Sequence, residues 1–291
     1  MLQAVRSRLS GSCLAWLVFA GCGRLGFDAI DKFADAGVGD AELVADGSGA
    51  GFGAPTLIPS LSSIKDEFGA TVSGDGLQIA FSSQRSGSWT LYTASRASAS
   101  APFGAPLPMT NLEGNGGVTD EELSSDGLDL QYAMSNDDTV VRHARRAAGA
   151  MAWTPTGLDM QGHELNGPSL ALDDLRMLVG NASGVEEWGR ADHASAWTLL
   201  RSHPTLDGTS WPGISSDGLE IFVIASVNHQ LFRATRRSTD EAFGTREPVR
   251  FGAAFDLARF TDPELAADGH SLYLTIDVGD GNGYDIYVAT R

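Results

Sequence analysis

The chain has 291 residues, of which 42% are hydrophobic, and it contains 35 glycines and 11 prolines. This length suits one large β domain or two smaller ones, and the glycines and prolines predict many turns. Its 37 acidic residues against 20 basic ones argue against nucleic-acid binding, which requires a basic surface. Both cysteines, Cys13 and Cys22, lie near the start, so no disulfide can link parts of the main body.

The first 22 residues have the pattern of an export signal. Arg6 and Arg8 precede an apolar run from Cys13 to Ala20, and small residues follow. The run is much shorter than the roughly 20 residues of a transmembrane helix, so no membrane span is predicted here.

The stretch "FAGC", Phe19–Cys22, resembles the lipobox of bacterial lipoproteins. In that family the cysteine is acylated and becomes the new N-terminus, which implies removal of residues 1–21 and a lipid on Cys22. Gly23 stands where lipoproteins kept at the inner membrane tend to carry Asp, so the resemblance implies the outer membrane. The alternative is an ordinary signal peptide with an incidental cysteine.

The segment after the predicted lipid site is rich in Gly, Ala and Asp and has few large apolar residues. Such a composition buries too little surface to offset the entropy of ordering the chain. We therefore predict that residues 22–50 form a flexible acidic tether and that residues 51–291 form the folded domain.

The body of the chain contains a repeat built around an Asp-Gly-like turn. Each turn is followed by an apolar run, and successive turns are 44 to 51 residues apart. Asp-Gly between such runs predicts a β-hairpin. The turns lie at Asp75, Asp126, Asp173, Asp217 and Asp268.

Two further motifs each recur in four of the five repeats, and the third copy of the first motif, "EWGRAD" (Glu187–Asp192), is degraded. One is a strand that ends in arginine, "LYTASR", "VRHARR", "LFRATR" and "IYVATR", which ends at Arg96, Arg146, Arg236 and Arg291. We interpret these arginines as structural ion-pairing positions. The other motif is an aromatic-led strand, which begins at Phe103, Trp153, Trp197 and Phe243. Four short strands in 44 to 51 residues correspond to one β-propeller blade.

The segments "SSDGLEIFVIAS" and "AADGHSLYLTIDVGDGNGYDIYVATR" resemble the WD40-like (PD40) repeats of the TolB C-terminal propeller. The resemblance covers roughly residues 60–291 and implies a β-propeller fold. The chain has five copies where TolB has six blades, and it lacks TolB's separate N-terminal domain. TolB's role and partners are therefore not transferred.

The fifth copy has no aromatic-led strand after it. The missing segment occurs at the other end of the repeats, because "FGAPTLIPSL", Phe52–Leu61, matches "FGAPLPMTNL", Phe103–Leu112, without a gap. We predict an all-β, five-bladed propeller of four-stranded antiparallel blades. In this fold residues 51–61 form the outer strand of the last blade, close the ring and cover its exposed edge.

The strand that enters each Asp-Gly turn normally lies nearest the propeller axis. "TDEEL" and "TDPEL" place Asp120, Glu122, Asp262 and Glu264 on these strands, and Trp211 shares a column with the two aspartates. Five-bladed glycosidases place acidic residues there, and a carboxylate pair suits acid–base catalysis. The alternative interpretation, which we favour, is repeat decay together with solvated acidic residues at the strand starts, since other blades carry Thr, Ser or Gly in these columns.

A second candidate is the hairpin "DVGDGNGYD". Closely spaced oxygen ligands around glycine suit calcium, and the ligand set would be Asp277, Asp280, Asn282 and Asp285. The family resemblance implies an ordinary Gly/Asn turn at this point, and a structural hairpin is the favoured interpretation.

No catalytic, phosphate-binding or cofactor motif stands out in the sequence. The leading functional hypothesis is a lipid-anchored envelope propeller that binds a protein or glycan partner without catalysis, in the outer membrane and facing the periplasm or the cell surface. The alternative is a carbohydrate-active enzyme that uses the channel carboxylates.

Overall fold

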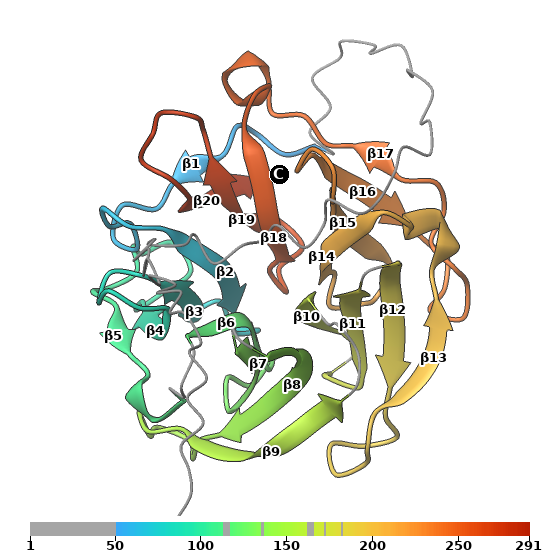
Figure 1. The fold of residues 1–291 in the computed structure, drawn as a ribbon, viewed down its shortest axis with the longest axis horizontal. Coiled ribbons are helices and arrows are strands. Elements are labelled where there is room, and N and C mark those ends of the chain that lie inside the picture. The colour runs from blue at the N-terminus through green and yellow to red at the C-terminus, as the bar shows by residue number, and fades with distance from the viewer. Residues whose placement is uncertain (1–50, 113–116, 135–136, 162–165, 172, 182) are drawn as a thin grey trace, which may run out of the picture. The chain divides into compact units, whose positions relative to one another are not determined.

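The computed structural model describes residues 51–291 apart from 113–116, 135–136, 162–165, 172 and 182. The predicted signal peptide, Cys22 and the predicted tether lie outside the described residues. The described chain forms five sheets of four antiparallel strands, and Figure 1 shows them as blades around one axis. Within the described ranges, no helix has the length and hydropathy needed to cross a membrane.

Each of the first four blades is continuous in sequence. Blade 1 contains β2 (Glu67–Val72), β3 (Gln78–Ser83), β4 (Thr90–Ser95) and β5 (Leu107–Pro108). Blade 2 contains β6 (Val118–Leu123), β7 (Asp129–Met134), β8 (Asp137–Arg145) and β9 (Thr154–Gln161). Blade 3 contains β10 (Asn166–Ala171), β11 (Arg176–Asn181), β12 (Gly184–Gly189) and β13 (Thr198–Ser202). Blade 4 contains β14 (Thr209–Ile214), β15 (Glu220–Ala225), β16 (Leu231–Thr235) and β17 (Glu247–Pro248).

Blade 5 is assembled from both ends of the described chain. It contains β18 (Arg259–Leu265), β19 (Ser271–Asp277), β20 (Asp285–Thr290) and β1 (Thr56–Leu57). Thr56 pairs with Val288, and the Gly53 N–H donates to the Thr290 carbonyl at 2.8 Å. The predicted closure of the ring by the segment 51–61 is therefore confirmed, as is the five-bladed all-β fold.

The connections between blades are short. Three of them contain a single turn of 3-10 helix, namely η2 (Thr110–Leu112), η3 (Pro204–Leu206) and η4 (Ala253–Phe255). Each connection leads from an outer strand to the next inner strand, so β2, β6, β10, β14 and β18 all lie nearest the axis (Figure 1).

The Asp-Gly turns explain why the strands begin where they do. The carboxylate of Asp75 accepts the N–H of Leu77 at 2.9 Å, as is typical of a turn aspartate. Asp126, Asp217 and Asp268 accept the N–H two residues later in the same way. In the third copy, which lacks the glycine, Asp174 takes its left-handed conformation with φ 61°, and its buried carboxylate accepts hydrogen bonds from Ser125 of blade 2.

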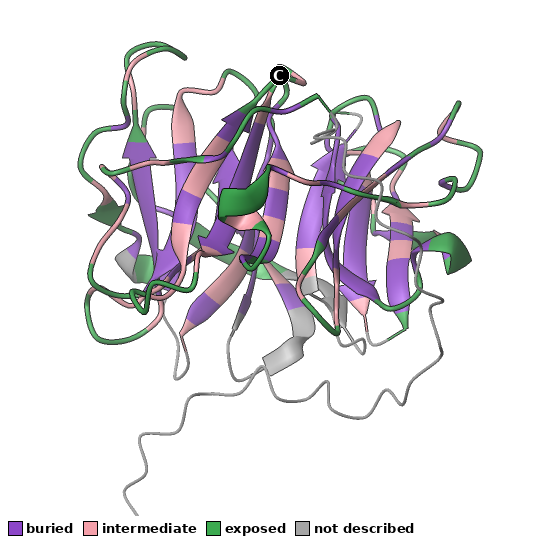
Figure 2. Ribbon diagram, turned by 90° about the horizontal axis from the view of Figure 1, so that it is seen from above, coloured by how far each residue is buried: buried purple, intermediate pink, exposed green. Residues whose placement is uncertain are grey.

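The hydrophobic core is divided among the five junctions between blades, with one cluster of buried side chains at each. Figure 2 shows buried residues along the strands and exposed residues in the loops of both faces. The apolar runs predicted after the turns are buried, for example Ile79 and Phe81 in blade 1 and Leu272 and Leu274 in blade 5. Because neighbouring blades share each cluster, the blades stabilise one another.

A second set of contacts, which we call the arginine ring, lies at the Asp-Gly turns. In every blade an arginine stacks on the aromatic residue of the outer segment, with 4.3 to 4.7 Å between the guanidinium and the ring centroid, and its Nε donates to a turn carbonyl. The pairs are Arg96–Phe103, Arg146–Trp153, Arg190–Trp197, Arg236–Phe243 and Arg291–Phe52.

The arginine ring also joins neighbouring blades. Arg236 donates to Glu187 of blade 3 at 2.8 Å, and Arg291 donates to Glu220 of blade 4 at 2.7 Å. The predicted ion pairing is found for Arg236 and Arg291. Arg96 and Arg146 instead donate to uncharged groups of the neighbouring blade, the Tyr273 hydroxyl and the Gln78 side chain. Arg190 is the fifth member.

Candidate functional site: the acidic channel

Each inner strand carries a β-bulge at the same place. The register with the second strand shifts there, and one residue adopts a left-handed conformation with φ between 46° and 66°. These residues, which we call the bulge position, are Gly69, Asp120, Gly167, Trp211 and Asp262. Glycine tolerates this conformation, but tryptophan rarely adopts it, so blade 4 holds local backbone strain beside the axis.

The five bulges surround one small cavity on the axis. It has a volume of about 20 Å³ and is lined by all five predicted residues, Asp120, Glu122, Trp211, Asp262 and Glu264. Glu121 also lines it, and none of the lining residues is basic. The volume accommodates a water molecule or a single ion but not a sugar ring. The structure thus brings the predicted residues together in a space that excludes a polysaccharide.

One column of the inner strands joins each blade to the next. The Thr71 hydroxyl accepts the N–H of Leu123 at 3.0 Å, and it donates to Glu122 Oε2 at 3.1 Å. Glu122 Oε1 in turn accepts the N–H of Leu170 at 2.6 Å. Glu122 therefore links the inner strands of blades 1, 2 and 3.

The same contact continues round the ring. Ser169 accepts the N–H of Ile214 at 3.1 Å, and Glu264 accepts the N–H of Val72. The column, hereafter the channel column, comprises Thr71, Glu122, Ser169, Gly213 and Glu264. Each of these side chains accepts a backbone N–H of the next blade, which explains why Thr, Ser and Glu replace one another in this column.

Gly213 breaks the channel column. A Cβ added to Gly213 would lie 1.8 Å from the carbonyl oxygen of Pro263 in blade 5. The backbones of β14 and β18 thus approach each other directly, and no side chain fits between them.

The channel carboxyl groups have raised pKa values. Burial raises the pKa of Asp262 to about 7 and that of Glu264 to about 8, and the neighbouring Asp120 adds to the shift of Asp262. Burial also raises the pKa of Glu122 well above its usual value, and the charge of Glu264 raises it further. The charge inside the channel therefore changes with pH in the neutral range.

Glu121 is a channel residue that the sequence analysis missed. Its side chain is 4% exposed, and neither carboxylate oxygen has a hydrogen-bond partner. Burial raises its pKa well above the usual value, the backbone N–H groups of Glu121 and Ser82 offset part of this rise, and the charges of Asp120 and Asp262 add to it. The strict alternation assumed from sequence fails at the bulge, which is why Glu121 faces the same cavity as its neighbours.

In the hairpin that we considered as a calcium site, the aspartate oxygens accept hydrogen bonds from the hairpin's own backbone and from Ser62. Asp277 accepts the N–H of Gly279 at 2.8 Å, and Asp280 accepts the N–H of Asn282 at 2.9 Å. Asp285 accepts a hydrogen bond from the Ser62 hydroxyl, which ties the hairpin to the segment after β1. In the described part of the chain, no three Asp, Glu, His or Cys side chains form a ready-made metal site.

The sequence analysis also missed a buried ionic cluster around Glu187 in β12. Its carboxylate is fully buried and accepts hydrogen bonds from Arg236 at 2.8 and 3.1 Å, and His203 Nε2 lies 3.1 Å away. Burial alone would raise the pKa of Glu187, but His203 and Arg236 outweigh it and lower the pKa to about 2. This cluster fastens blade 3 to blade 4 and offers no open space for a ligand.

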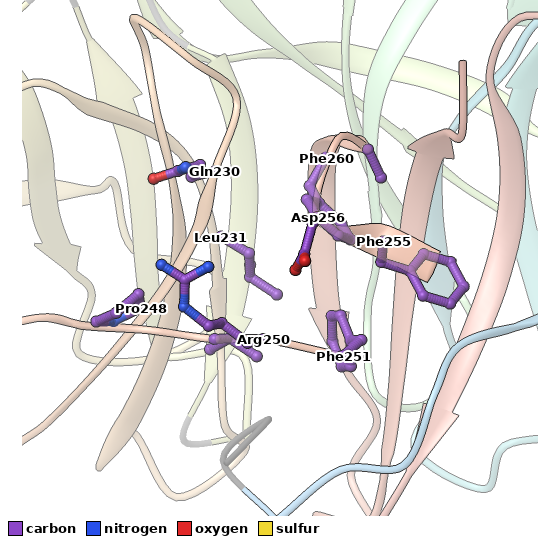
Figure 3. Close-up of a pocket in the computed structure, with 10 residues that line it drawn as sticks. Gln230, Leu231, Pro248, Arg250, Phe251, Phe255, Asp256 and Phe260 are labelled. Carbon is purple, nitrogen blue, oxygen red and sulfur yellow. The ribbon is translucent and has the colours of Figure 1, made fainter. Parts of the chain in front are cut away.

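A second hollow, of about 30 Å³, lies between the outer part of blade 4 and the segment that leads into β18. Figure 3 shows its apolar wall, with Leu231 and Phe251, and its polar side chains, Arg250, Asp256 and Gln230. Phe251 packs against Phe255 and Phe260 at centroid distances of 6.2 and 5.8 Å. The hollow is a gap in blade packing and is too small for an organic ligand.

No protein-family model matches the sequence, and no curated protein sequence matches it. Among solved structures, the chain is similar to a TolB-type protein from Agrobacterium tumefaciens, with 16% identity over 79% of each chain and a TM-score of 0.48. It is also similar to TolB from Acinetobacter baumannii, with 13% identity, 80% of this chain, 56% of that chain and a TM-score of 0.46. A luciferin-regenerating enzyme matches at 12% identity over 81% of this chain and 95% of that chain, with a TM-score of 0.45. The five-bladed fold itself follows from the strand pairing in this chain.

Proposed function

We propose that this chain is a lipid-anchored envelope propeller that serves as a binding or scaffold module for a protein or glycan partner. The observation that supports the proposal most is the position of the seam, by which we mean the pairing of β1 with β20 where the two ends of the described chain meet. The ring is complete from residue 51 onward, and residue 53 is fixed beside Thr290 at the end of the last strand. A lipid on Cys22 would therefore hold an intact ring on a tether and leave its loop faces accessible. The repeated Asp-Gly turns and terminal arginines support membership of the WD40-like (PD40) repeat class.

The anchor is tested by metabolic labelling with palmitate in cells that express the full chain. We expect label on the wild type and none on Cys22→Ala, with the wild type in the outer-membrane fraction. Wild-type protein that takes up no label would refute the anchor.

The binding role is tested by photo-crosslinking in living cells. Val227 and Leu257, which are 84% and 92% exposed, lie in loops on the face opposite the Asp-Gly turns. A crosslinker at either position should give a discrete adduct with one partner, and the same crosslinker at the buried Leu274 serves as the control. The absence of adducts from both positions would argue against a partner that binds this face.

The enzymatic alternative is supported by one observation, the convergence of five carboxyl side chains and Trp211 on the same cavity. The small volume of the cavity argues against this enzymatic role, and so do the hydrogen bonds that the Glu122 oxygens already accept from neighbouring blades. Assays on plant polysaccharides provide the test. Hydrolysis by the wild type that is lost in Asp262→Asn would replace the binding proposal with a glycosidase.

A further inference from the structure

The central cavity is lined by acidic side chains without a basic one. Five carboxyl side chains line a space of about 20 Å³, and the lining contains no lysine, arginine or histidine. Burying carboxylates without a cation is costly in a low-dielectric interior, where like charges repel strongly.

Most of these groups have partners in neighbouring blades. Glu122 accepts hydrogen bonds from Thr71 and the Leu170 N–H, and Glu264 accepts one from the Val72 N–H. Asp262 is hydrogen-bonded to the Gly69 N–H and to Thr261. Their carboxyl groups therefore already contribute to the junctions between blades.

Glu121 differs from these three. Its two oxygens are buried and make no hydrogen bond of normal geometry, although the N–H groups of Glu121 and Ser82 lie nearby. They lie 3.1 and 3.2 Å from where a Cβ on Gly69 would be. Gly69 lines the cavity from blade 1 and Glu121 lines it from blade 2, so the free carboxylate stands at the cavity wall. Nothing in the junctions between blades requires an acid at this position, because blades 3, 4 and 5 have proline there.

We propose that the channel cavity binds a hard inorganic cation, with Ca²⁺ as the best fit, held by the carboxylate of Glu121. Ca²⁺ accepts irregular sets of carboxylate, carbonyl and water oxygens, whereas Mg²⁺ requires a near-octahedral set. Asp120 and Asp262 are close enough to Glu121 to affect its ionisation, so their charges would add to the attraction. In this proposal the carboxylate of Glu121 binds the ion directly, and the neighbouring Asp120 and Asp262 attract it through their charge, so the site does not need three chelating side chains. It is independent of the proposed anchor and partner.

The test is thermal unfolding of the full chain at pH 8, first in a chelator and then with CaCl₂ or with NaCl at matched ionic strength. We expect saturating Ca²⁺ to raise the Tm of the wild type by about 5 °C or more, with little effect of NaCl. Glu121→Gln should lose this response and should melt higher than the wild type in chelator, since it removes a buried charge. A wild-type Tm that Ca²⁺ leaves unchanged, or an equal response in Glu121→Gln, would overturn the site.

Two further variants locate the ion. Asp280→Asn removes a carboxylate from the hairpin on blade 5 and should retain the full Ca²⁺ response, whereas a response lost in this variant would assign the ion to the hairpin and overturn the channel site. Tb³⁺ is a luminescent probe for Ca²⁺ sites, and Trp211 in the cavity wall should sensitise its emission. Trp211→Phe should reduce that emission, and emission unchanged by the substitution would contradict the proposal. Should Glu121→Gln fail to fold, Asp262→Asn should weaken Tb³⁺ binding, and unchanged affinity would overturn the site.

Discussion

The two sets of contacts that join the blades differ in how strictly they constrain the sequence. The arginine ring uses the same chemistry in all five blades, an arginine stacked on an aromatic ring and bonded to a turn carbonyl. The channel column uses Thr, Glu, Ser and Glu, and it has a break at Gly213. Stacking requires a planar cation and a ring, whereas a backbone N–H requires only an acceptor. The inner contacts can therefore vary in charge, and the outer contacts cannot.

The largest predicted effect comes from opening the arginine ring at the seam. A chain that begins at Leu61 loses β1 and the Phe52–Arg291 stack, so the ring should stay open. We expect a loss of about 5 kcal/mol and a fall in Tm of about 10 °C or more, measured by circular dichroism. A chain that begins at residue 51 is the control and should melt like the full chain. Equal melting of the two chains would show that the seam is dispensable.

The second prediction concerns the break in the channel column. Gly213→Ala places a methyl group 1.8 Å from the Pro263 carbonyl, which is backbone and cannot move aside. We expect a loss of about 3 kcal/mol in urea unfolding. Gly53→Ala is the matched control, because its added Cβ would lie 3.6 Å from the nearest atom, and it should change stability by less than about 1 kcal/mol. Tolerance of Gly213→Ala would mean that blades 4 and 5 can separate easily.

The third prediction tests the ion pair that links the arginine ring to blade 3. The pKa of Glu187 is about 2 in the folded chain and higher when unfolded, so the unfolded state takes up protons first as the pH falls. Its contribution is complete above pH 4.5 and disappears as the pH falls toward 2. Wild type should lose about 3 kcal/mol more than Glu187→Gln over this range in urea unfolding. If the stabilities of the wild type and Glu187→Gln fall in parallel as the pH is lowered, the ionised Glu187 does not stabilise the junction between blades 3 and 4.

The smallest predicted effect is the loss of one contact of the channel column. Ser169→Ala deprives the Ile214 N–H of its acceptor and should cost about 1 kcal/mol. Amide hydrogen exchange at Ile214 should become faster, while the exposed Ser100→Ala should leave it unchanged. Unaltered exchange at Ile214 would show that the contact adds nothing to the junction.

The fold was largely predictable because the residues that repeat along the chain are those that form the same turn or the same stack in each blade. The Asp-Gly turns fixed the number of blades, and the match of Phe52 to Phe103 located the seam. Arg190 was missed because "EWGRAD" keeps the arginine but loses the flanking pattern of the other copies. Its position seven residues before Trp197 would have been a usable signal, because Arg96, Arg146 and Arg236 stand seven residues before Phe103, Trp153 and Phe243.

The channel was less predictable because its contacts join residues about 50 positions apart. Sequence columns placed Glu122 near the axis, but its bond to the Leu170 N–H depends on how two blades meet. Glu121 was passed over because a period of two residues puts it on the opposite side from Glu122. The bulge at Asp120 breaks that period, and no residue type marks the bulge uniquely, since Gly, Asp and Trp all occupy it.

The seam also determines how the ring would respond to mechanical load. In the antiparallel pair β1–β20, Gly53 lies opposite the end of β20 and Leu57 lies deeper, opposite Tyr287. A pull on residue 51 away from the ring loads these hydrogen bonds one after another, as a zipper opens, and not all together as in shear. Tension on residue 51 would thus separate β1 from β20 before it loads the four continuous blades.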